Sequence, residues 1–535
     1  MLAAALGDCV HVAGLLGFLR LAEGDGWRTR FLGPAVPVRE LAGAIAAEAP
    51  ELVAVSYRLT DAAAARLFEE LGAALEEKRP RMVFGGTPPV CRAAAASGLF
   101  EACFGPESAP AEVLVYLRGE RGEDRAEAHP GTLLERMEAA RPLPLIRHHF
   151  GQPTLEATAA GIERLAAARA LDVVSLGPDQ NAQACFFRPG EIDPAQDGAG
   201  GVPVRRPEDF ALLYQASRRG NHPLLRCYSG TRDILRLAEV LLREIKNAWA
   251  AIPLCWYNEL DGRSDRPLGP AIAENLEAVR WHAARGVPVE INESHHWSLR
   301  EAHDTIAVVM AYLAAYNARA AGVRHYVAQY MFNTPAGTSF TMDLGKMLAK
   351  VRLIEGLHGE TFQTYRQVRT GLASMPAGYG RAKGQLGSST MLQMALAPHI
   401  VHVVGFSEAD HAATPDDIVE SADLVRQVIA NCLHGLPDLA ADPAVATRRD
   451  ELLAEAEVLL DAIRKTAPGG AGDPLADPAT FERAIRRGLL DAPHLRGGPV
   501  ARGAMVTRMV DGACRVVDSG TGRPISEAER LRRLA

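Results

Sequence analysis

The sequence lacks a long apolar run, since nowhere do the roughly 20 uninterrupted apolar residues of a membrane-spanning helix occur. It also lacks an excess of positive charge, because 58 Lys and Arg stand against 65 Asp and Glu, for a net charge of -7. Nucleic-acid-binding proteins carry a basic footprint that this composition does not show. We therefore expect neither a membrane nor a nucleic acid as partner.

Cysteine is scarce and unpatterned. The eight cysteines form no Cys-x-x-Cys pair and stand mostly in apolar segments of a chain of 535 residues. Reduced thiols in the cytoplasm fit this usage better than a disulfide framework. The apolar N-terminus lacks a basic segment and is interrupted by Asp8 and His11, so we expect a buried strand and turn there rather than a signal peptide.

The first 118 residues alternate short apolar runs with helical patterns, one of which covers Asp61–Glu77. This alternation predicts an α/β protein that begins with a doubly wound, flavodoxin-like parallel sheet. Residues 119–131 are charged and aperiodic, and we expect a linker over 119–141. The expected strands are Leu2–Leu6, Thr29–Leu32, Leu52–Ser56, Arg81–Gly85 and Ala102–Phe104.

A second series of strands and helices covers 142–430, and several of its strands end in polar residues. It predicts a (β/α)8 TIM-like barrel as the catalytic domain, since such barrels place their chemistry at the carboxyl ends of the strands. Seven strands are clear, and His148–Phe150 or Ser388–Thr390 marks the eighth. The seven are Leu171–Leu176, Leu224–Tyr228, Ile252–Trp256, Val287–Asn292, His325–Gln329, Tyr365–Arg369 and Ile400–Val404.

Residues 431–535 are expected to form a C-terminal extension that packs on the barrel or on a second subunit. The extension has helical patterns first, and then an apolar alternation that predicts a β-hairpin with its turn at Ser519–Gly522.

Three loops of the N-terminal sheet carry residues suited to a ligand. They are Gly7–Gly14, Ser56–Thr60 and Gly85–Pro88, and each follows an expected strand. The carboxyl ends of parallel strands meet at one edge of a sheet, where such folds bind ligands. Ordinary turn chemistry explains any one of these loops, whereas the three together favour a binding site.

These loops resemble the cobalamin-binding domain of mutases and methyltransferases, which carries Asp-x-His-x-x-Gly, then Ser-x-Leu, then Gly-Gly. The resemblance covers 1–118 and includes a last loop at Phe104–Glu107. It implies that the His11 imidazole is the lower ligand of cobalt, and that Ser56 and the Gly85-Gly86 backbone line a slot for the displaced nucleotide tail. The implied cofactor residues here are Asp8, Cys9, His11, Gly14, Ser56, Leu59, Gly85, Gly86 and Thr87.

Two intervals depart from that pattern by one residue. Asp8 precedes His11 by three residues instead of two, so that Cys9 takes the place of the acid. The interval from Ser56 to Leu59 is likewise one residue longer. Either Asp8, through a bulged turn, or Cys9 therefore stands where the partner of the His11 ring is expected.

The barrel segment resembles the large subunit of glutamate (methylaspartate) mutase over most of 170–430. The family's Arg-His-Gly-Thr-Pro-Asp corresponds to Leu225–Asp233, its Ser-Tyr-Asn to Trp256–Asn258, and its His-Ile-Asn-Arg to Val289–Asn292. Where the family's Lys-Thr-Pro-His-Glu-Ala holds the adenosyl ribose, this chain has Gly405–His411, with a Glu but no Lys. The resemblance therefore implies that Glu408 binds the ribose of adenosylcobalamin.

The family holds the two carboxylates of glutamate with three arginines, for which the planar guanidinium fork is suited. This sequence offers one of them, Arg226, and places Glu293 where the last arginine stands. A carboxylate would repel a dicarboxylate and attract an ammonium group. We therefore expect a small amino or carboxylic acid other than glutamate, bound by Arg226, Asn258 and Glu293.

The resemblance implies an adenosylcobalamin-dependent radical isomerase, a carbon-skeleton mutase, acting as a cytoplasmic homodimer. A corrinoid methyltransferase is an alternative, which we rank lower because no helical cap precedes residue 1. An aminomutase that also uses pyridoxal phosphate would need a lysine, and Lys383 stands in a glycine-rich segment. A cobalamin-binding protein without catalysis is the remaining alternative.

Overall fold

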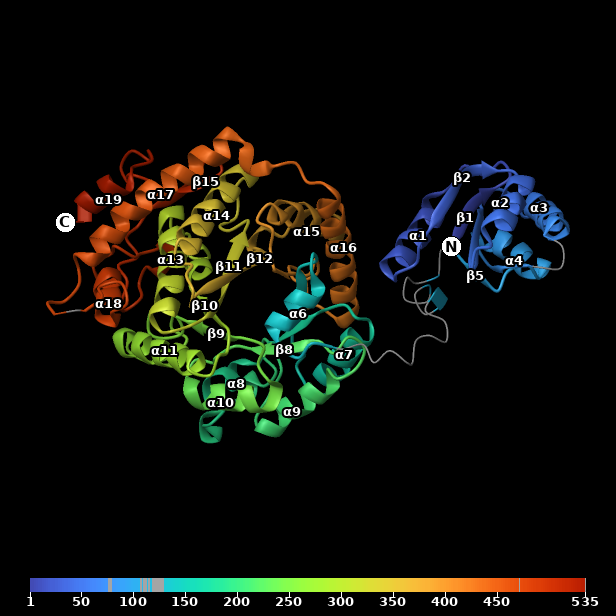
Figure 1. The fold of residues 1–535 in the computed structure, drawn as a ribbon. Coiled ribbons are helices and arrows are strands. Elements are labelled where there is room, and N and C mark those ends of the chain that lie inside the picture. Colours follow the sequence, from blue (N-terminus) through green and yellow to red (C-terminus); the bar gives the residue numbers. More distant parts are fainter. Residues whose placement is uncertain are drawn as a thin grey trace. The chain divides into compact units, whose positions relative to one another are not determined.

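The computed structural model describes residues 1–535 apart from 76–78, 106–107, 109–112, 114–115, 118–128, 471 and 535. The described residues fall into two compact units, Met1–Ala128 and His129–Ala535, shown in Figure 1. The end of the expected helix at 76–77, residues 119–128 of the expected linker, and Pro106 and Glu107 lie outside the described residues. Within the described part, no helix is long and apolar enough to cross a membrane.

The N-terminal unit is a five-stranded parallel sheet of order β2-β1-β3-β4-β5, which confirms the doubly wound prediction. Its strands are β1 (Leu2–Leu6), β2 (Arg30–Val36), β3 (Leu52–Tyr57), β4 (Arg81–Gly86) and β5 (Ala102–Phe104). Its helices include α1 (Ala13–Gly24), α2 (Val38–Glu48), α3 (Asp61–Ala74) and α4 (Pro88–Ser97). Alternate residues of β1 face opposite sides: Leu2 and Ala4 pack in one apolar core with α2, α3 and α4, while Ala3 packs with α1 in the other.

The second unit is an eight-stranded parallel barrel, as the sequence predicts. Its strands are β6 (Leu145–Phe150), β7 (Val173–Leu176), β8 (Leu224–Cys227), β9 (Ala250–Pro253), β10 (Val289–Asn292), β11 (His325–Phe332), β12 (Gln363–Thr370) and β13 (Ile400–His402). Each strand pairs with its neighbour in sequence except β8 and β9, which are the ends of the sheet. β13 pairs with β6, and an isolated bridge from Tyr228 to Ala251 joins the two ends.

The eighth strand is β6, so the assignment of His148–Phe150 is confirmed and that of Ser388–Thr390 is wrong. The latter residues lie in the helix α15 (Tyr379–Met394), where the Thr390 hydroxyl donates to the Leu386 carbonyl at 2.8 Å. The Thr390 hydroxyl thus finds its partner inside the helix. A short polar segment with Ser and Thr is therefore compatible with a helix as well as with a strand.

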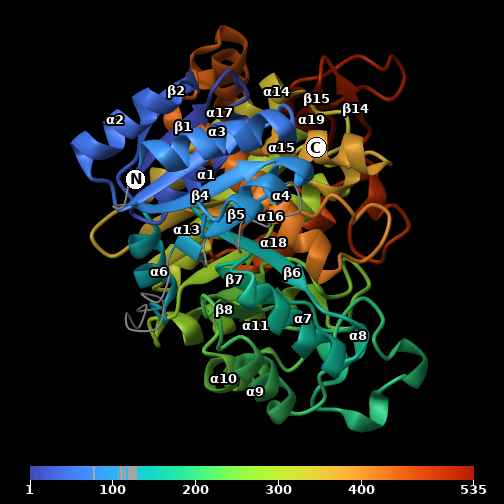
Figure 2. The same cartoon turned by 90° about the vertical axis from the view of Figure 1, so that its right-hand side faces the viewer.

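Helices surround the barrel (Figure 1), and Figure 2 shows β6, β7 and β8 side by side. The larger outer helices, besides α15, are α7 (Leu155–Ala167), α9 (Pro207–Ala216), α10 (Ile234–Ile245), α11 (Leu268–Ala283), α13 (Asp304–Ala320), α14 (Phe340–Glu355) and α16 (Pro415–His434). A short helix α6 (Leu133–Ala140), within the segment expected as a linker, packs Leu133 and Met137 on the first residues of the barrel strands. These apolar side chains fill the amino end of the barrel, which leaves its polar interior at the carboxyl end.

The C-terminal extension adds α17 (Pro443–Arg464), α18 (Pro478–Arg486), the hairpin β14 (Thr507–Val510) and β15 (Ala513–Val516), and α19 (Glu527–Leu534). The hairpin is confirmed, but its turn is Asp511-Gly512 and not Ser519–Gly522. Both turn residues have positive φ, 50° and 75°, as a two-residue hairpin turn requires. The Ser519–Gly522 segment instead follows β15, where the Asp518 carboxylate accepts from the Thr521 amide at 2.6 Å.

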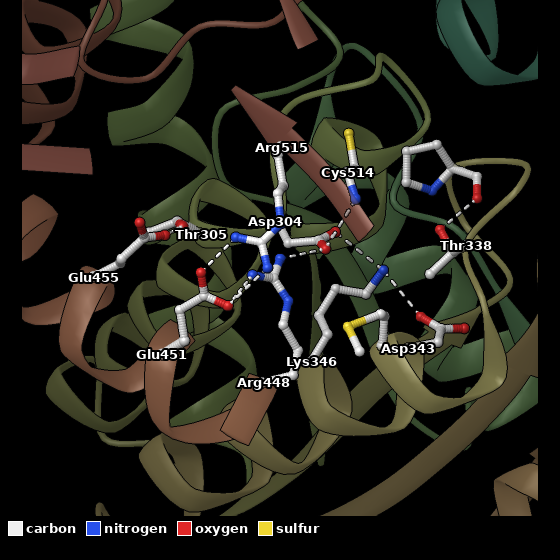
Figure 3. Close-up of polar contacts among 12 residues, drawn as sticks. Asp304, Thr305, Thr338, Asp343, Lys346, Arg448, Glu451, Glu455, Cys514 and Arg515 are labelled. Carbon is white, nitrogen blue, oxygen red and sulfur yellow. Dashed lines mark hydrogen bonds and ion pairs between the residues drawn. The ribbon is translucent and has the colours of Figure 1, made fainter. Parts of the chain in front are cut away.

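A buried cluster of charges fastens this extension to the barrel (Figure 3). Asp304 at the start of α13 accepts from Arg448 of α17 at 2.8 Å and from the Cys514 amide of β15 at 3.3 Å. Lys346 of α14 lies 3.3 Å from Asp304 and 2.9 Å from Asp343. The nearby cations hold the pKa of Asp304 below its ordinary value even though burial raises it. The carboxylates and cations thus compensate one another inside the protein.

Replacing Lys346 with Met should destabilise the barrel unit by about 3–5 kcal/mol, because two buried carboxylates lose their shared cation. Guanidinium unfolding followed by tryptophan fluorescence would measure the change. Lys465→Met, at an exposed lysine, is the matched control and should be nearly neutral. An equal stability of the two variants would contradict the structural role of Lys346.

Candidate functional site

A cavity of about 370 Å³ lies in the N-terminal unit between α1 and the carboxyl ends of β3, β4 and β5. Most of its wall is apolar. The ring centres of Phe18 and Phe104 in this wall lie 5.7 Å apart. The structure brings together most of the residues that the sequence predicts for the cofactor in this unit. Those that line the cavity are His11, Gly14, Ser56, Gly85, Gly86 and Thr87.

Ser56 presents an unpaired hydroxyl to this cavity. The residue is 5% exposed, and its Oγ has no hydrogen-bond partner among the described residues. A buried hydroxyl without a partner costs free energy, so a polar ligand atom in the cavity would be stabilising there.

Two glycines shape the wall for different reasons. A Cβ at Gly86 would lie 2.7 Å from both the Tyr57 carbonyl oxygen and the Phe84 ring, so no larger residue fits. At Gly14 no protein atom lies within 4 Å of a Cβ position, although the residue lines the cavity. A side chain at Gly14 would therefore occupy space that the fold leaves open for a ligand.

The loop that carries His11 begins at Gly7, whose φ of 67° places it in the left-handed region. His11 is exposed at the cavity, whereas Cys9 is 0% exposed and packs in the core of the unit. The exposed Asp8 accepts a hydrogen bond from Tyr57 at 3.2 Å. Cys9 is therefore committed to the core, while Asp8 stays in the loop of the imidazole. Leu59, the remaining predicted residue of this unit, is exposed and lies outside the cavity wall.

The interior of the barrel holds a second polar assembly, organised around the buried carboxylate of Glu290. Arg226 lies 3.1 Å and Arg147 lies 3.7 Å from one of its oxygens, and all three side chains are at most 1% exposed. The Trp249 indole donates to the same oxygen at 2.7 Å. Burial lowers the pKa of Arg147 to about 9, helped by the charge of Arg226.

Hydrogen bonds extend this assembly across the barrel. Arg147 donates to Gln367 at 2.6 Å, Gln367 donates to Gln329 at 3.3 Å, and the Gln329 amide meets His295 Nδ1 at 2.9 Å. Since the amide nitrogen can only donate, His295 Nδ1 is the acceptor. The chain of bonds links β6, β12 and β11 to the loop after β10.

His149 and Tyr228 form a close pair at the carboxyl ends of β6 and β8. The Tyr228 hydroxyl lies 2.7 Å from His149 Nε2, and Arg147 approaches the same nitrogen at 3.1 Å. Burial lowers the pKa of His149 well below its ordinary value, and the charges of Arg147 and Arg226 lower it further. His149 is therefore neutral, and its Nε2 accepts from Arg147, because a guanidinium can only donate.

Arg369 adds a third guanidinium to this interior. Its charge acts on Tyr228, Glu408 and Glu290, and burial lowers its pKa. In the part of the chain that the structure describes, no carboxylate lies within ion-pair distance of Arg369, and Arg226 Nε and Nη1 have no hydrogen-bond partner. The site thus has more positive charge than its own acids neutralise, which favours an anionic ligand.

The three residues predicted to bind the substrate, Arg226, Asn258 and Glu293, have different partners in the structure. Arg226 belongs to the Glu290 assembly. Glu293 accepts from the Leu254 and Cys255 amides at 3.0 Å and from the Trp297 indole at 2.8 Å.

Asn258 also uses its side chain on its own loop. It donates to the Cys255 carbonyl at 3.0 Å and accepts from the Leu260 amide at 2.9 Å. Asn258 and Glu293 therefore hold the loops after β9 and β10, and neither polar group is free for a ligand in this conformation.

Glu408 lies in the loop after β13 with its side chain 25% exposed. Its Oε1 accepts from the Gly405 amide at 2.8 Å and lies 2.9 Å from His148 Nε2. The bonds from His148 and Gly405 hold the pKa of Glu408 below its ordinary value despite burial. One oxygen is thus fixed by the protein while the carboxylate keeps an accessible side.

Lys383 lies in the helix α15 rather than in a loop. It pairs with Glu420 at 2.5 Å and lies 4.5 Å from the centre of the Phe406 ring. The lysine is committed to a surface ion pair, so this structure offers no support for an imine at that position.

Sequence reasoning missed Arg147, His149, Tyr228 and Arg369. Arg147 and His149 alternate on β6, Arg369 lies two residues after Gln367 on β12, and Tyr228 follows β8 two residues after Arg226, which is the period of side chains that face one side of a strand. Polar residues at every second position of a buried barrel strand were the available signal.

Comparison with known proteins bears on the first unit. Residues 1–115 match the family model of the B12 binding domain. The N-terminal unit is a B12-binding domain. The matched residues do not include the barrel. No curated protein matches the chain.

Two solved structures are similar in part. One is a novel cobalamin-binding protein from Desulfitobacterium hafniense DCB-2, 23% identical over 22% of this chain, with a TM-score of 0.19. This chain covers 56% of that protein, little more than half its length. The other is a candidate lyase/mutase from Burkholderia cenocepacia J2315, 13% identical over 64% of this chain and 97% of that one, with a TM-score of 0.28. Neither score is high enough to add to the assignment.

Proposed function

We propose that this protein is an adenosylcobalamin-dependent radical isomerase that acts on a small amino or carboxylic acid. The observation that carries the proposal is the cavity beside α1, where six residues from three loops of the B12-binding domain meet. The barrel adds a buried, positively charged interior, and resemblance to the large subunit of glutamate mutase supplies the reaction class.

The first unit would hold the cofactor with His11 and the cavity wall. The exposed His11 imidazole would bind the cobalt of the cofactor, because an imidazole nitrogen is a good metal ligand. The nucleotide tail would enter the cavity, where the open space at Gly14 and the unpaired Ser56 hydroxyl receive it. When bound, adenosylcobalamin supplies a cobalt–carbon bond whose homolysis provides the radical for hydrogen abstraction and 1,2-migration.

The barrel residues would bind the substrate and exclude water. Arg369 is half-buried and has no carboxylate within ion-pair distance in the described chain, so it is suited to bind a substrate carboxylate. The buried Arg226 adds positive charge to the same interior. Glu408 would accept from a ribose hydroxyl on its accessible side, as the resemblance implies. Glu293 and Asn258 would act by holding the surrounding loops in place.

We also propose a homodimer in the cytoplasm, following the resemblance. The methyltransferase and binding-protein alternatives share the cofactor cavity, but neither breaks the cobalt–carbon bond homolytically as the isomerase does. Electron paramagnetic resonance (EPR) therefore separates the isomerase from both alternatives.

Gly14→Leu should weaken cobalamin binding by at least about tenfold, because the new side chain fills the space at the cavity wall. Quenching of intrinsic fluorescence on titration with hydroxocobalamin would measure the dissociation constant. Gly43→Leu is the matched control, since Gly43 lies on α2 outside the cavity and also has no atom near its Cβ position. Unchanged binding by Gly14→Leu would contradict the assignment of the cavity.

Arg369→Gln should reduce substrate-dependent radical formation by at least about tenfold, because an anionic substrate loses its charged partner. The measurement is the cobalt(II)-coupled EPR signal of adenosylcobalamin-loaded protein mixed with pooled amino and carboxylic acids. Cofactor affinity should stay unchanged, and Arg381→Gln, at an exposed arginine of α15, should keep the signal. A full signal from Arg369→Gln would contradict its role, whereas no signal from the unaltered protein would overturn the radical reaction itself.

A further inference from the structure

The two lengthened loops of the B12-binding domain meet in the structure. One carries Asp8 and the other carries Tyr57, and the Tyr57 hydroxyl donates to Asp8 at 3.2 Å. Tyr57 is buried, and burial together with the Asp8 charge raises the pKa of its phenol. A hydrogen bond therefore joins the two segments that depart from the family's spacing.

The longer interval between Ser56 and Leu59 also places Arg58 at the cavity. Arg58 is exposed and is part of the cavity wall, on the same loop as the unpaired Ser56 hydroxyl. No Asp or Glu is among the described residues of that wall, and no described carboxylate lies within ion-pair distance of Arg58. Among the described residues, the Arg58 guanidinium at the cavity thus has no counterion.

The chemistry of cobalamin identifies the group that Arg58 would bind. The side chains of the corrin ring end in neutral amides, and the phosphodiester of the nucleotide tail is the ionised group at neutral pH. A guanidinium fork matches phosphate oxygens with two parallel hydrogen bonds. We propose that Arg58 binds the phosphodiester of the cobalamin nucleotide tail, so that this chain selects complete cobalamin over corrinoids without the tail. This inference rests on the proposed cofactor site.

The geometry gives the two loop residues separate tasks. Tyr57 points to Asp8 and fixes the loop against its neighbour, while Arg58 faces the cavity. Ser56, immediately before them, supplies a further donor at 5% exposure. A charged contact at a partly open mouth is screened by salt, so its contribution should fall as ionic strength rises.

The test compares hydroxocobalamin with diaquacobinamide, which keeps the corrin ring and lacks both phosphodiester and base. Dissociation constants are measured by fluorescence quenching for the full-length protein, Arg58→Gln, Arg58→Lys and the control Arg39→Gln. Arg39 is an exposed residue of α2 outside the cavity, so its variant carries the same change in net charge. Circular dichroism confirms that each variant is folded.

We expect Arg58→Gln to weaken hydroxocobalamin binding by about three- to tenfold at low salt, with a smaller loss at high salt. Arg58→Lys should recover part of the affinity, and Arg39→Gln and all cobinamide constants should be unchanged. Equal losses for both corrinoids, or no loss for either, would overturn the role of Arg58. If the unaltered protein binds neither corrinoid, the cofactor site itself is overturned. A preference for cobalamin that is undiminished in Arg58→Gln leaves the site intact but refutes this inference.

Discussion

The ion pair between Glu290 and two guanidiniums is the interaction on which the barrel interior depends. It lets Arg147 and Arg226 stay buried, and their charges in turn help to keep His149 neutral. Removing the carboxylate would leave two uncompensated cations in the centre of the protein. The excess of positive charge that remains, with Arg369 partly open, is what gives the interior its preference for anions.

Much of the fold follows from local pattern. The continuous apolar run Leu2–Leu6 matches β1 residue for residue, because a strand buried on both faces needs no polar alternation. The barrel strand β6 is harder to predict from the sequence, since the inward-facing polar side chains of Arg147 and His149 interrupt its apolar run. The turn predicted at Ser519–Gly522 is wrong because Asp511-Gly512, a two-residue turn signal, already connects the paired strands.

The residues of the candidate site likewise divide into those that the sequence predicts and those that it does not. Loop residues such as His11, Ser56 and Gly86 could be predicted because each follows a strand of a parallel sheet, where the fold itself gathers them. Glu293 and Asn258 look like substrate ligands in sequence, yet their bonds to nearby backbone groups exist only in three dimensions. Arg369 could not be linked to Arg147 from sequence, because the two are separated by most of the barrel.

The most direct test of the central claim is whether His11 binds cobalt. Protein grown with 15N-histidine and loaded anaerobically with adenosylcobalamin would be frozen after mixing with pooled amino and carboxylic acids, and its EPR spectrum recorded beside that of His11→Ala. The account predicts a cobalt(II) signal split by one imidazole 15N and coupled to an organic radical, with the splitting lost in His11→Ala. A bound cofactor whose spectrum shows no imidazole splitting, or no homolysis with any acid, would contradict it.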